Sequence, residues 1–393
     1  MHLPFIALAL LLAALATPAS ASSNRPSPLL KWRTTTSSIP GKYIVKFKDT
    51  ATNISLNSVL TSHKPDHVFR APGFKGFSAS LDTASLATIR ALPDVEFVEE
   101  DSIVSINGVT AQEGAPWNLA RLSSRTWTPG EDTYRYEESA GAGTCVYVVD
   151  TGVDGTHPEL AGRVVWGVNT AGDNISTDGN GHGTAVAGVA AGIIHGVAKR
   201  STVVVVKVLN AGGSGTTSGV IAGLSFIVTD SSTRTGCPNG TVANISLGGS
   251  RSTAINAAAA ALVNSGVFVS VAAGGSDDDV QFYSPASEPS VFTVGATDIE
   301  DAKSWSSNHG EGVDLFAPGE DITAPWIGGG NALSGTSFSA AHVSGLAAYF
   351  LGLKPNMPVP ELGKYIQSVA TRDVITGLPV GTKNLLAYNG IDL

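Results

Sequence analysis

Val146-Tyr147-Val148-Val149 is a run of four apolar residues, and Asp150-Thr151-Gly152 follows it directly. Such an uninterrupted run is typical of a strand that is buried on both faces of a parallel sheet. Parallel sheets place functional groups where a strand passes into a glycine-containing loop. The stretch therefore predicts a buried strand over 146–149 and makes Asp150 a candidate functional carboxylate at its end.

Two further stretches have the same apolar character, at residues 203–209 and 267–273. Between them, the alanine-rich segment 252–265 predicts a helix. Buried strands that alternate with helices of small residues favour an α/β fold with a doubly wound, mostly parallel sheet.

Two other motifs supply chemistry that matches Asp150. The motif at 179–184 contributes His182, and the motif at 334–340 contributes Ser337 ahead of a predicted helix of small residues. A serine hydroxyl is a poor nucleophile until a base takes its proton, and that base needs a partner that fixes its tautomer. Each motif alone is compatible with a helix cap or an ordinary turn. Together they predict a catalytic triad, with Ser337 near a helix N-terminus that favours negative charge.

The order Asp, His, Ser resembles that of the subtilisin family of serine endopeptidases. From Ala115 onward the chain is similar to the fungal proteinase K branch of that family. The resemblance implies that Ser337 attacks the scissile carbonyl, that His182 moves the proton and that Asp150 holds the imidazole. It also implies a secreted, self-maturing monomer that cleaves protein or peptide substrates with broad specificity. Two alternatives are an inactive relative that binds peptides, and an esterase or peptide ligase with the same triad.

The resemblance also assigns a substrate cleft. An extended peptide would pair as an added strand with two glycine-containing segments, at 213–215 and 246–248. The residues after the strand at 267–273 would line a pocket for an apolar or aromatic side chain. Plain turn glycines are the alternative for either segment. The predicted substrate-binding residues are Gly213, Ser214, Gly215, Ser246, Leu247, Gly248, Ala273 and Gly274.

One position departs from the family pattern. The family has an Asn after Ala-Ala-Gly, and its amide donates a hydrogen bond to the oxyanion of the reaction; this chain has Gly275 there. In subtilisin itself, loss of that donor lowers turnover about 10²–10³-fold. The backbone N–H of Ser337 remains as the other donor. Three outcomes are open: donation by Ser276 or a water, a slow enzyme, or a protein that only binds peptides. The acidic run at 277–279 is expected to be a solvated loop.

The N-terminus and the composition predict an exported protein. Residues 1–21 combine an apolar core at 5–15 with the small residues Ala19-Ser20-Ala21, which is typical of a signal peptide. A membrane anchor is the alternative, but the run is too short to span a bilayer. The net charge of -9 argues against a nucleic-acid partner. No later segment is long enough to cross a membrane, so no membrane partner is expected.

Residues 22–109 are predicted to form a propeptide. A linker rich in Ser, Thr and Pro reaches to about residue 39. Strands are predicted over 42–48, 77–81 and 95–101, with a helix over 86–90. This small α+β unit, about 40–107, resembles the inhibitor-type propeptide of subtilisins, with an independent binding domain as the alternative. The resemblance implies that the propeptide inhibits the peptidase domain, residues 110–393, until a cut near Val109/Thr110.

The two cysteines, Cys145 and Cys237, predict a disulfide in an oxidising compartment, with two free thiols as the alternative. Their positions match one bridge of proteinase K-like enzymes. Sequons occur at four asparagines, of which Asn174 and Asn239 are the predicted glycosylation sites and Asn244 is expected to stay unmodified. The other sequon is at Asn53.

The chemistry predicted from the triad requires no cofactor. The family commonly binds calcium through backbone carbonyls and one carboxylate, and the resemblance places these ligands at Pro289, Val291 and Asp314. Oxygen ligands on loops suit this ion. An aspartate that caps a turn is the alternative.

Overall fold

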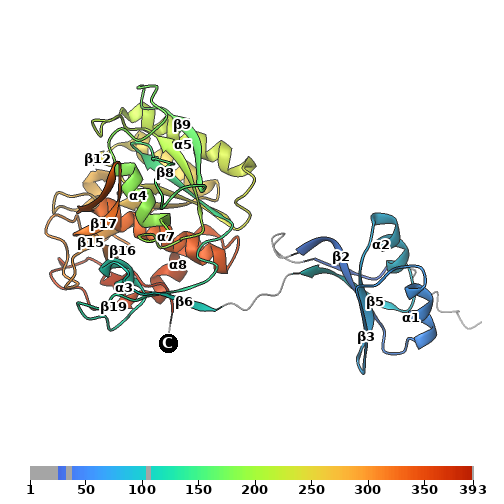
Figure 1. Cartoon of the computed structure of the whole chain (residues 1–393). Coiled ribbons are helices and arrows are strands. Elements are labelled where there is room, and N and C mark those ends of the chain that lie inside the picture. Colours follow the sequence, from blue (N-terminus) through green and yellow to red (C-terminus); the bar gives the residue numbers. More distant parts are fainter. Residues whose placement is uncertain (1–24, 32–37, 103–107, 392–393) are drawn as a thin grey trace, which may run out of the picture. The chain divides into compact units, whose positions relative to one another are not determined.

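The computed structural model describes residues 25–31, 38–102 and 108–391. The predicted signal peptide and about half of the predicted linker lie outside these residues. The chain divides into two compact units, Met1–Val104 and Ser105–Leu393 (Figure 1).

The smaller unit has a five-stranded sheet of order β1-β5-β2-β4-β3, antiparallel except for the β1–β5 pair. Leu56 and Ile89 of its two helices pack in one core with Val45, Phe77 and Val98 of the sheet. The predicted α+β unit is confirmed. The prediction missed α1 because only Leu56 and Val59 of its eight residues are buried, and it missed β3. The elements are β1 (Leu29–Leu30), β2 (Ser38–Phe47), α1 (Asn53–Leu60), β3 (His67–Ala71), β4 (Phe74–Ser80), α2 (Thr83–Arg90) and β5 (Val95–Ser102).

The larger unit has a nine-stranded sheet of order β19-β20-β16-β15-β13-β11-β8-β10-β9. All neighbouring strands in it are parallel except β19 and β20. The predicted mostly parallel α/β sheet is confirmed. The strands are β8 (Thr144–Asp150), β9 (Val164–Asn169), β10 (Thr202–Lys207), β11 (Gly240–Ile245), β13 (Phe268–Ala272), β15 (Phe292–Thr297), β16 (Leu315–Pro318), β19 (Thr371–Arg372) and β20 (Leu385–Leu386).

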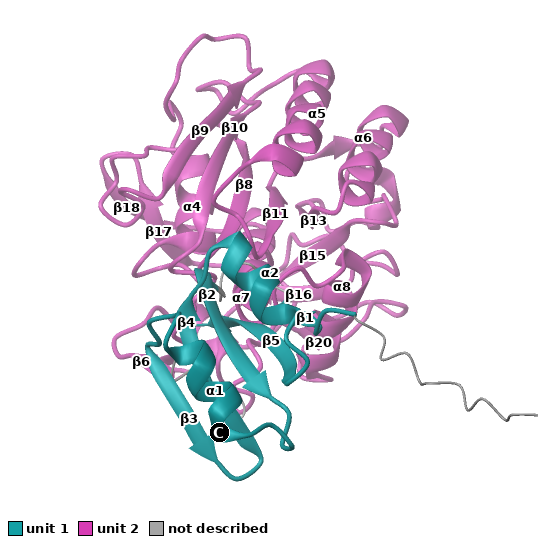
Figure 2. Ribbon diagram, turned by 90° about the vertical axis from the view of Figure 1, so that its right-hand side faces the viewer, with its two compact units in different colours: residues 1–104 teal, residues 105–393 magenta. Residues whose placement is uncertain are grey.

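Helices cover both faces of this sheet, which explains the uninterrupted apolar runs of its strands. Along β8, Val146 and Val148 belong to one core cluster, while Tyr147 and Val149 belong to the other. Figure 2 shows α5 and α6 next to each other on one side. The first cluster includes residues of α4 (His182–Ala191), α7 (Thr336–Leu353) and α8 (Val359–Val369), and the second includes residues of α5 (Thr217–Thr233) and α6 (Thr253–Asn264).

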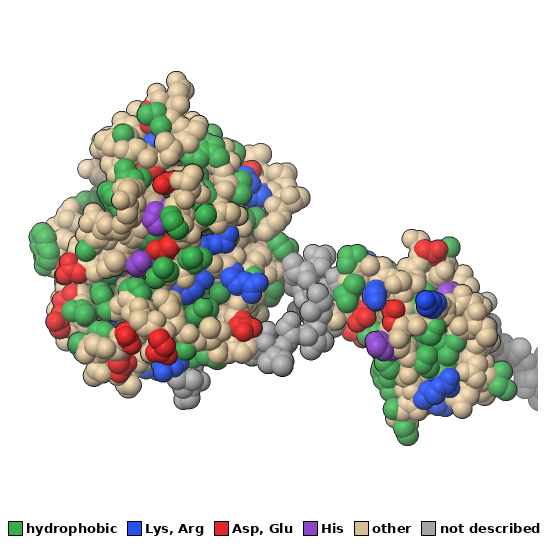
Figure 3. All heavy atoms as spheres, in the orientation of Figure 1, with side chains coloured by type: hydrophobic (Ala, Val, Ile, Leu, Met, Phe, Trp, Pro, Cys, Tyr) green, Lys and Arg blue, Asp and Glu red, His purple; other side chains and the backbone are tan. Residues whose placement is uncertain are grey.

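Shorter elements complete the larger unit. Cys145 at the start of β8 is bonded to Cys237, just before the neighbouring strand β11. The described residues form no helix that is both long and apolar enough to cross a membrane. Charged side chains of both signs, interrupted by apolar and uncharged surface, are visible on the face of this unit drawn in Figure 3. The shorter elements are β6 (Val109–Gln112), α3 (Trp117–Leu122), β7 (Tyr134–Glu137), β12 (Gly249–Ser250), η1 (Val280–Phe282), β14 (Tyr283–Ser284), β17 (Ile322–Trp326) and β18 (Gly329–Leu333).

Candidate active site

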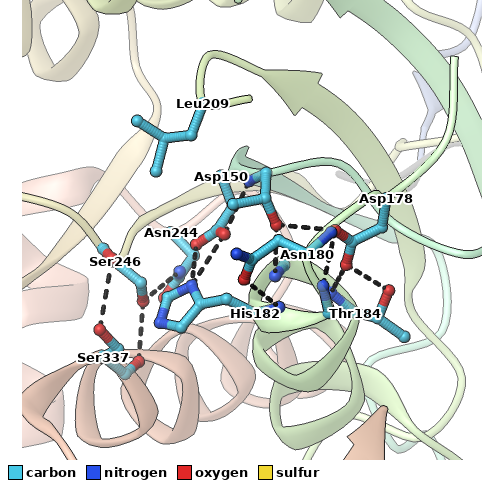
Figure 4. A network of polar contacts seen from close by, with 12 residues as sticks. Asp150, Asp178, Asn180, His182, Thr184, Leu209, Asn244, Ser246 and Ser337 are labelled. Atoms are coloured by element: carbon cyan, nitrogen blue, oxygen red, sulfur yellow. Dashed lines mark hydrogen bonds and ion pairs between the residues drawn. The ribbon is translucent and has the colours of Figure 1, made fainter. Parts of the chain in front are cut away.

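Asp150 and His182 form a hydrogen-bonded pair at the carboxyl end of β8 (Figure 4). Asp150 is the last residue of β8 and is fully buried, while His182 is the first residue of α4. His182 Nδ1 lies 2.8 Å from Asp150 Oδ1 and 2.9 Å from Asp150 Oδ2. The charge of Asp150 raises the pKa of His182, against the opposing effect of burial. A proton on Nδ1 leaves Nε2 as the basic atom of the ring.

The glycines on either side of His182 are required by close packing. Gly181 has φ of 109°, and a Cβ there would lie 2.3 Å from the ring of Trp326. A Cβ at Gly183 would lie 2.0 Å from the carbonyl oxygen of Gly152, the loop residue that follows the end of β8. The Gly-His-Gly sequence therefore lets the start of α4 approach the backbone beside Asp150.

Asp178 holds the loop that leads into α4, and the sequence analysis did not identify it. Its buried carboxylate accepts hydrogen bonds of 2.9 Å from the backbone N–H groups of Asn180, Gly181 and Thr184. It also accepts from the hydroxyls of Thr151 and Thr184. Burial acts to raise the pKa of Asp178, but these hydrogen bonds outweigh it and the pKa is lowered. An Asp in the polar loop shortly before α4 is the one sequence signal that points to it.

Ser337 is the second residue of α7, so it lies at a helix N-terminus as predicted. A buried polar chain links it to β11: Asn244 Nδ2 donates to Ser246 Oγ at 2.7 Å, and Ser246 Oγ donates to the carbonyl oxygen of Ser337 at 2.7 Å. Ser344 of α7 donates to Asn244 Oδ1 at 2.9 Å. These hydrogen bonds set the position of Ser337 beside the Asp150–His182 pair (Figure 4).

In this arrangement, Ser337 Oγ donates to the carbonyl oxygen of Ser246 at 3.3 Å. Hydrogen bonds between catalytic groups are often long or poorly aligned without substrate and tighten in the complex. The Ser337 hydroxyl therefore points to Ser246 in this structure, and a proton transfer to His182 would require it to turn.

The helix behind Ser337 contains a second, buried histidine. His342 Nδ1 donates to the carbonyl oxygen of Phe338 at 2.8 Å, and Asn118 Nδ2 donates to His342 Nε2 at 2.7 Å. Burial lowers the pKa of His342 to about 4, so the ring is neutral. The Phe338 ring lies 5.8 Å from the His182 ring, between centroids. This packing braces the first turn of α7.

Two cavities flank the Asp, His and Ser residues. One, of about 590 Å³, is lined by His182 and Leu209 together with segments 213–215 and 246–248. The other, of about 430 Å³, is lined by Ser337 together with segments 246–248 and 272–275. The structure thus brings all the predicted substrate-binding residues to one region; Leu209 is an addition. These residues are Gly213, Ser214, Gly215, Ser246, Leu247, Gly248, Ala273 and Gly274.

Gly275 lines the second cavity, and a Cβ built there would meet no atom within 4 Å. The preceding Gly274 is different: its φ is 105°, and a Cβ would lie 2.4 Å from Asn308. Asn308 holds this loop, since its Oδ1 accepts from the N–H of Ser276 at 2.9 Å and its Nδ2 donates to the carbonyl oxygen of Ala273 at 2.9 Å. The side chain that the family pattern supplies at 275 therefore has space in this chain.

The acidic run after Gly275 has partners of its own. Asp277 Oδ1 lies 2.7 Å from Lys303 Nζ, and this lysine lowers the pKa of Asp277. Asp279 accepts from the N–H of Gln281 at the start of η1. These contacts agree with the expected surface loop.

Pro289, Val291 and Asp314, the predicted calcium ligands, line one cavity of about 490 Å³. Lys383 lines it as well, and its Nζ lies 3.1 Å from Asp314 Oδ1. Burial raises the pKa of Asp314, and Lys383 opposes that effect. The described residues contain no group of three or more His, Cys, Asp or Glu that could hold a metal. Asp314 is the one carboxylate among the predicted ligands, and it is already paired with Lys383. The predicted ligands therefore do not fit a resident calcium ion.

The sequons differ sharply in exposure. Asn174 is exposed in the loop after β9. Asn239 is 8% exposed, and its Nδ2 donates to the carbonyl oxygen of Ala142 at 2.8 Å, so its use as a glycan site stays a prediction. Asn244 is fully buried, in line with its expected lack of modification. Asn174 is therefore the exposed candidate in the larger unit.

Comparison with known proteins identifies the family. Residues 141–389 match the model of the subtilase family, and residues 42–107 match that of the peptidase inhibitor I9. The cuticle-degrading protease of Metarhizium anisopliae is 48% identical over 99% of this chain and 100% of its own length. Proteinase R of Parengyodontium album is 48% identical over 93% of this chain and 92% of its own.

A solved structure gives the same result for the fold. The crystal structure of a cold adapted subtilisin-like serine proteinase has a TM-score of 0.67 and 40% sequence identity, and the match covers 71% of this chain and 100% of that one. Fold and site together define a serine hydrolase of the subtilisin type. The chain belongs to the subtilase family of serine proteases and carries an I9-type propeptide unit, as the sequence resemblance predicts.

Proposed function

We propose that the protein is a secreted endopeptidase that cleaves extended peptide segments with Ser337, His182 and Asp150 as its catalytic triad. One observation supports the proposal: Asp150 and His182 are hydrogen-bonded, and His182 and Ser337 line two cavities that share the segment 246–249. The walls of those cavities include the glycine-containing segments suited to pair with a substrate backbone.

The mechanism follows from the roles of the atoms. His182 Nε2 takes the proton of Ser337 Oγ as that oxygen attacks the scissile carbonyl, and Asp150 stabilises the imidazolium through Nδ1. The proton then passes to the leaving amine, and water releases the acyl group in a second round. The developing oxyanion meets the backbone N–H of Ser337 and the positive end of the α7 dipole. With glycine at 275, this backbone donor carries more of the stabilisation than in relatives with asparagine.

Specificity is proposed to be broad, with a preference for an apolar or aromatic residue before the cut. The 430 Å³ cavity beside Ser337 is lined by small residues, among them Gly248, Ala272, Ala273 and Gly274. No Lys, Arg, Asp or Glu is among its lining residues in the described chain. An apolar side chain gains most from such a pocket.

The domain assignment belongs to the same proposal: residues 1–21 as signal peptide, 22–109 as propeptide and 110–393 as peptidase. The I9 match over 42–107 supports an inhibitory role for the propeptide. The bond between Val109 and Thr110 lies in β6, which pairs with β7 through Val109–Glu137 and Thr110–Tyr136. Because a bond within a pair of strands cannot enter an active site, self-cleavage there requires β6 to leave β7. The disulfide and the exposed Asn174 sequon support export.

The deciding experiment compares the secreted wild type with Ser337→Ala. Two readouts are used: N-terminal sequencing, and hydrolysis of a peptide amide with an aromatic residue before the bond, alongside the matching ester. We expect wild type to mature and to cleave both substrates, while Ser337→Ala stays uncut and inactive. Normal maturation of Ser337→Ala would refute self-cleavage. Wild-type hydrolysis of the ester without the amide would refute the endopeptidase assignment.

A further inference from the structure

We propose that the ammonium group of Lys383 supplies the cation beside Asp314, the carboxylate that the family resemblance assigns to a calcium site. A covalently attached cation cannot be lost by dilution or chelation. The proposal gives this part of the protein a stability that does not depend on calcium, and it does not rest on the peptidase mechanism.

The contacts of Lys383 resemble those of a bound cation. Its Nζ donates to Asp314 Oδ1 at 3.1 Å, to the carbonyl oxygen of Val313 at 3.2 Å and to that of Glu311 at 3.3 Å. An ammonium has three N–H donors, and each has an oxygen partner here. Carbonyl and carboxylate oxygens are also the ligands that hard cations such as Ca²⁺ prefer.

Both carboxylate oxygens of Asp314 have hydrogen-bond partners. Besides Lys383, its Oδ1 accepts from Gln367 Nε2 at 3.3 Å, and its Oδ2 accepts from the N–H of Thr293 at 3.0 Å. The pair of Asp314 and Lys383 has no net charge. Calcium affinity depends on the number of charged ligands, and a divalent ion at Asp314 would also be repelled by the ammonium.

Two other carboxylates that line the cavity are hydrogen-bonded within their own turns. Glu288 Oε1 accepts from the N–H and the hydroxyl of Ser290, at 3.2 and 2.9 Å. Asp279 is occupied as the cap of η1. Glu311 contributes its backbone carbonyl to Lys383.

The neighbours of Lys383 on both sides are anchored, so the fold directs this lysine to the cavity. Thr382 Oγ1 accepts from the N–H of Gly310 at 3.1 Å. Asn384 bonds to Ile375 twice, accepting from its N–H at 3.0 Å and donating to its carbonyl oxygen at 2.8 Å. The resulting cation connects the C-terminal segment to Asp314, which lies directly before β16 and contacts β15 and α8.

The test removes the charge and asks whether calcium replaces it. Wild type, Lys383→Met, Asp314→Asn and the Asp314→Asn/Lys383→Met double variant are purified and treated with a sulfonyl fluoride to prevent autolysis. Calcium binding is measured by titration calorimetry, and thermal unfolding is measured in chelator and at increasing calcium chloride. Lys364→Met, at an exposed position of α8, is the matched control.

Lys383→Met is expected to gain one calcium site relative to wild type, with affinity at least about tenfold tighter than any wild-type binding at Asp314. Its unfolding midpoint should fall in chelator and rise with the logarithm of calcium concentration. The double variant and Lys364→Met should not gain the site. Binding by wild type that Asp314→Asn abolishes would overturn the proposal, since calcium would then be resident beside Lys383. A Lys383→Met variant that responds to calcium like wild type would also overturn it, because the oxygen cluster would not be a cation site.

Discussion

The two sides of Ser337 are built differently. On the histidine side, Asp150 is buried against His182, and Asp178 anchors the loop that carries the imidazole. On the opposite side, Gly275 offers no side chain, and the space where one would stand is open. In the proposed mechanism, proton transfer depends on side chains that are held by several hydrogen bonds, while oxyanion stabilisation is left largely to the backbone of α7.

This contrast separates two parts of catalysis, proton transfer and oxyanion stabilisation. Positioned acid–base groups and preorganised oxyanion donors contribute independently to lowering the barrier. This protein keeps the acid–base groups and has fewer oxyanion donors. Its turnover should therefore fall strongly when Asp150 or His182 is substituted. Its turnover should rise when a side-chain donor is introduced at Gly275.

The largest effect is expected from Asp150→Asn. The amide keeps the shape of the side chain but favours the wrong tautomer of His182, and the equivalent change in trypsin-like proteases lowers turnover about 10⁴-fold. Initial rates on a peptide amide give the measurement, with the exposed Asp132→Asn as the matched control. A loss below tenfold would show that the histidine side does not control the rate.

Gly275→Asn tests the opposite side. The new amide has space and should donate to the oxyanion, so turnover should rise, by at most the roughly 10²–10³-fold that this donor contributes in subtilisin. Gly275→Asp is the matched control, since its ionised carboxylate has the same shape but cannot donate. Equal turnover in wild type and Gly275→Asn would mean that another group already fills the donor role.

Asp178→Asn should lower the free energy of unfolding, a smaller effect than the changes in turnover above. The amide group would face the N–H and hydroxyl of Thr184, two donors that now share one carboxylate oxygen. Leaving buried donors unpaired lowers the free energy of unfolding by about 1–3 kcal/mol. Denaturant unfolding measures this loss, and the exposed Asp132→Asn, which should keep the wild-type stability, is the control. Unchanged stability in Asp178→Asn would contradict the anchoring role.

The smallest expected effect is on pH dependence. The carboxylates of Asp150 and Asp178 favour the protonated imidazole and raise the pKa of His182. Activity requires the neutral base, so kcat/KM should rise with pH through this raised pKa. Asp178→Asn should move this rise to lower pH, because one stabilising charge is removed. The raised pKa also stabilises the fold at low pH, and that contribution should fade as pH rises through the folded-state value. A kcat/KM profile of Asp178→Asn that moves to higher pH would contradict the effect of Asp178 on the pKa of His182.

Much of the fold and site was predictable because their signals are local. The runs at 146–149 and 203–209 predict strands buried on both faces, and the clusters on either side of β8 confirm it. Asp178 escaped prediction because an acidic residue in a polar loop has no distinctive pattern. The partnership of Asn118 with His342 escaped it because 224 positions separate the two residues.

The sequence by itself determined the strand runs, the two-unit order and the chemical types at Asp150, His182 and Ser337, since apolar runs and residue types are properties of neighbouring positions. Only the tertiary structure decided the partner of each polar group. It pairs Asp314 with Lys383 across 69 positions, buries Asn239 and leaves open space at Gly275. Hydrogen bonds and ion pairs depend on distance through space, and the folded chain alone sets that distance.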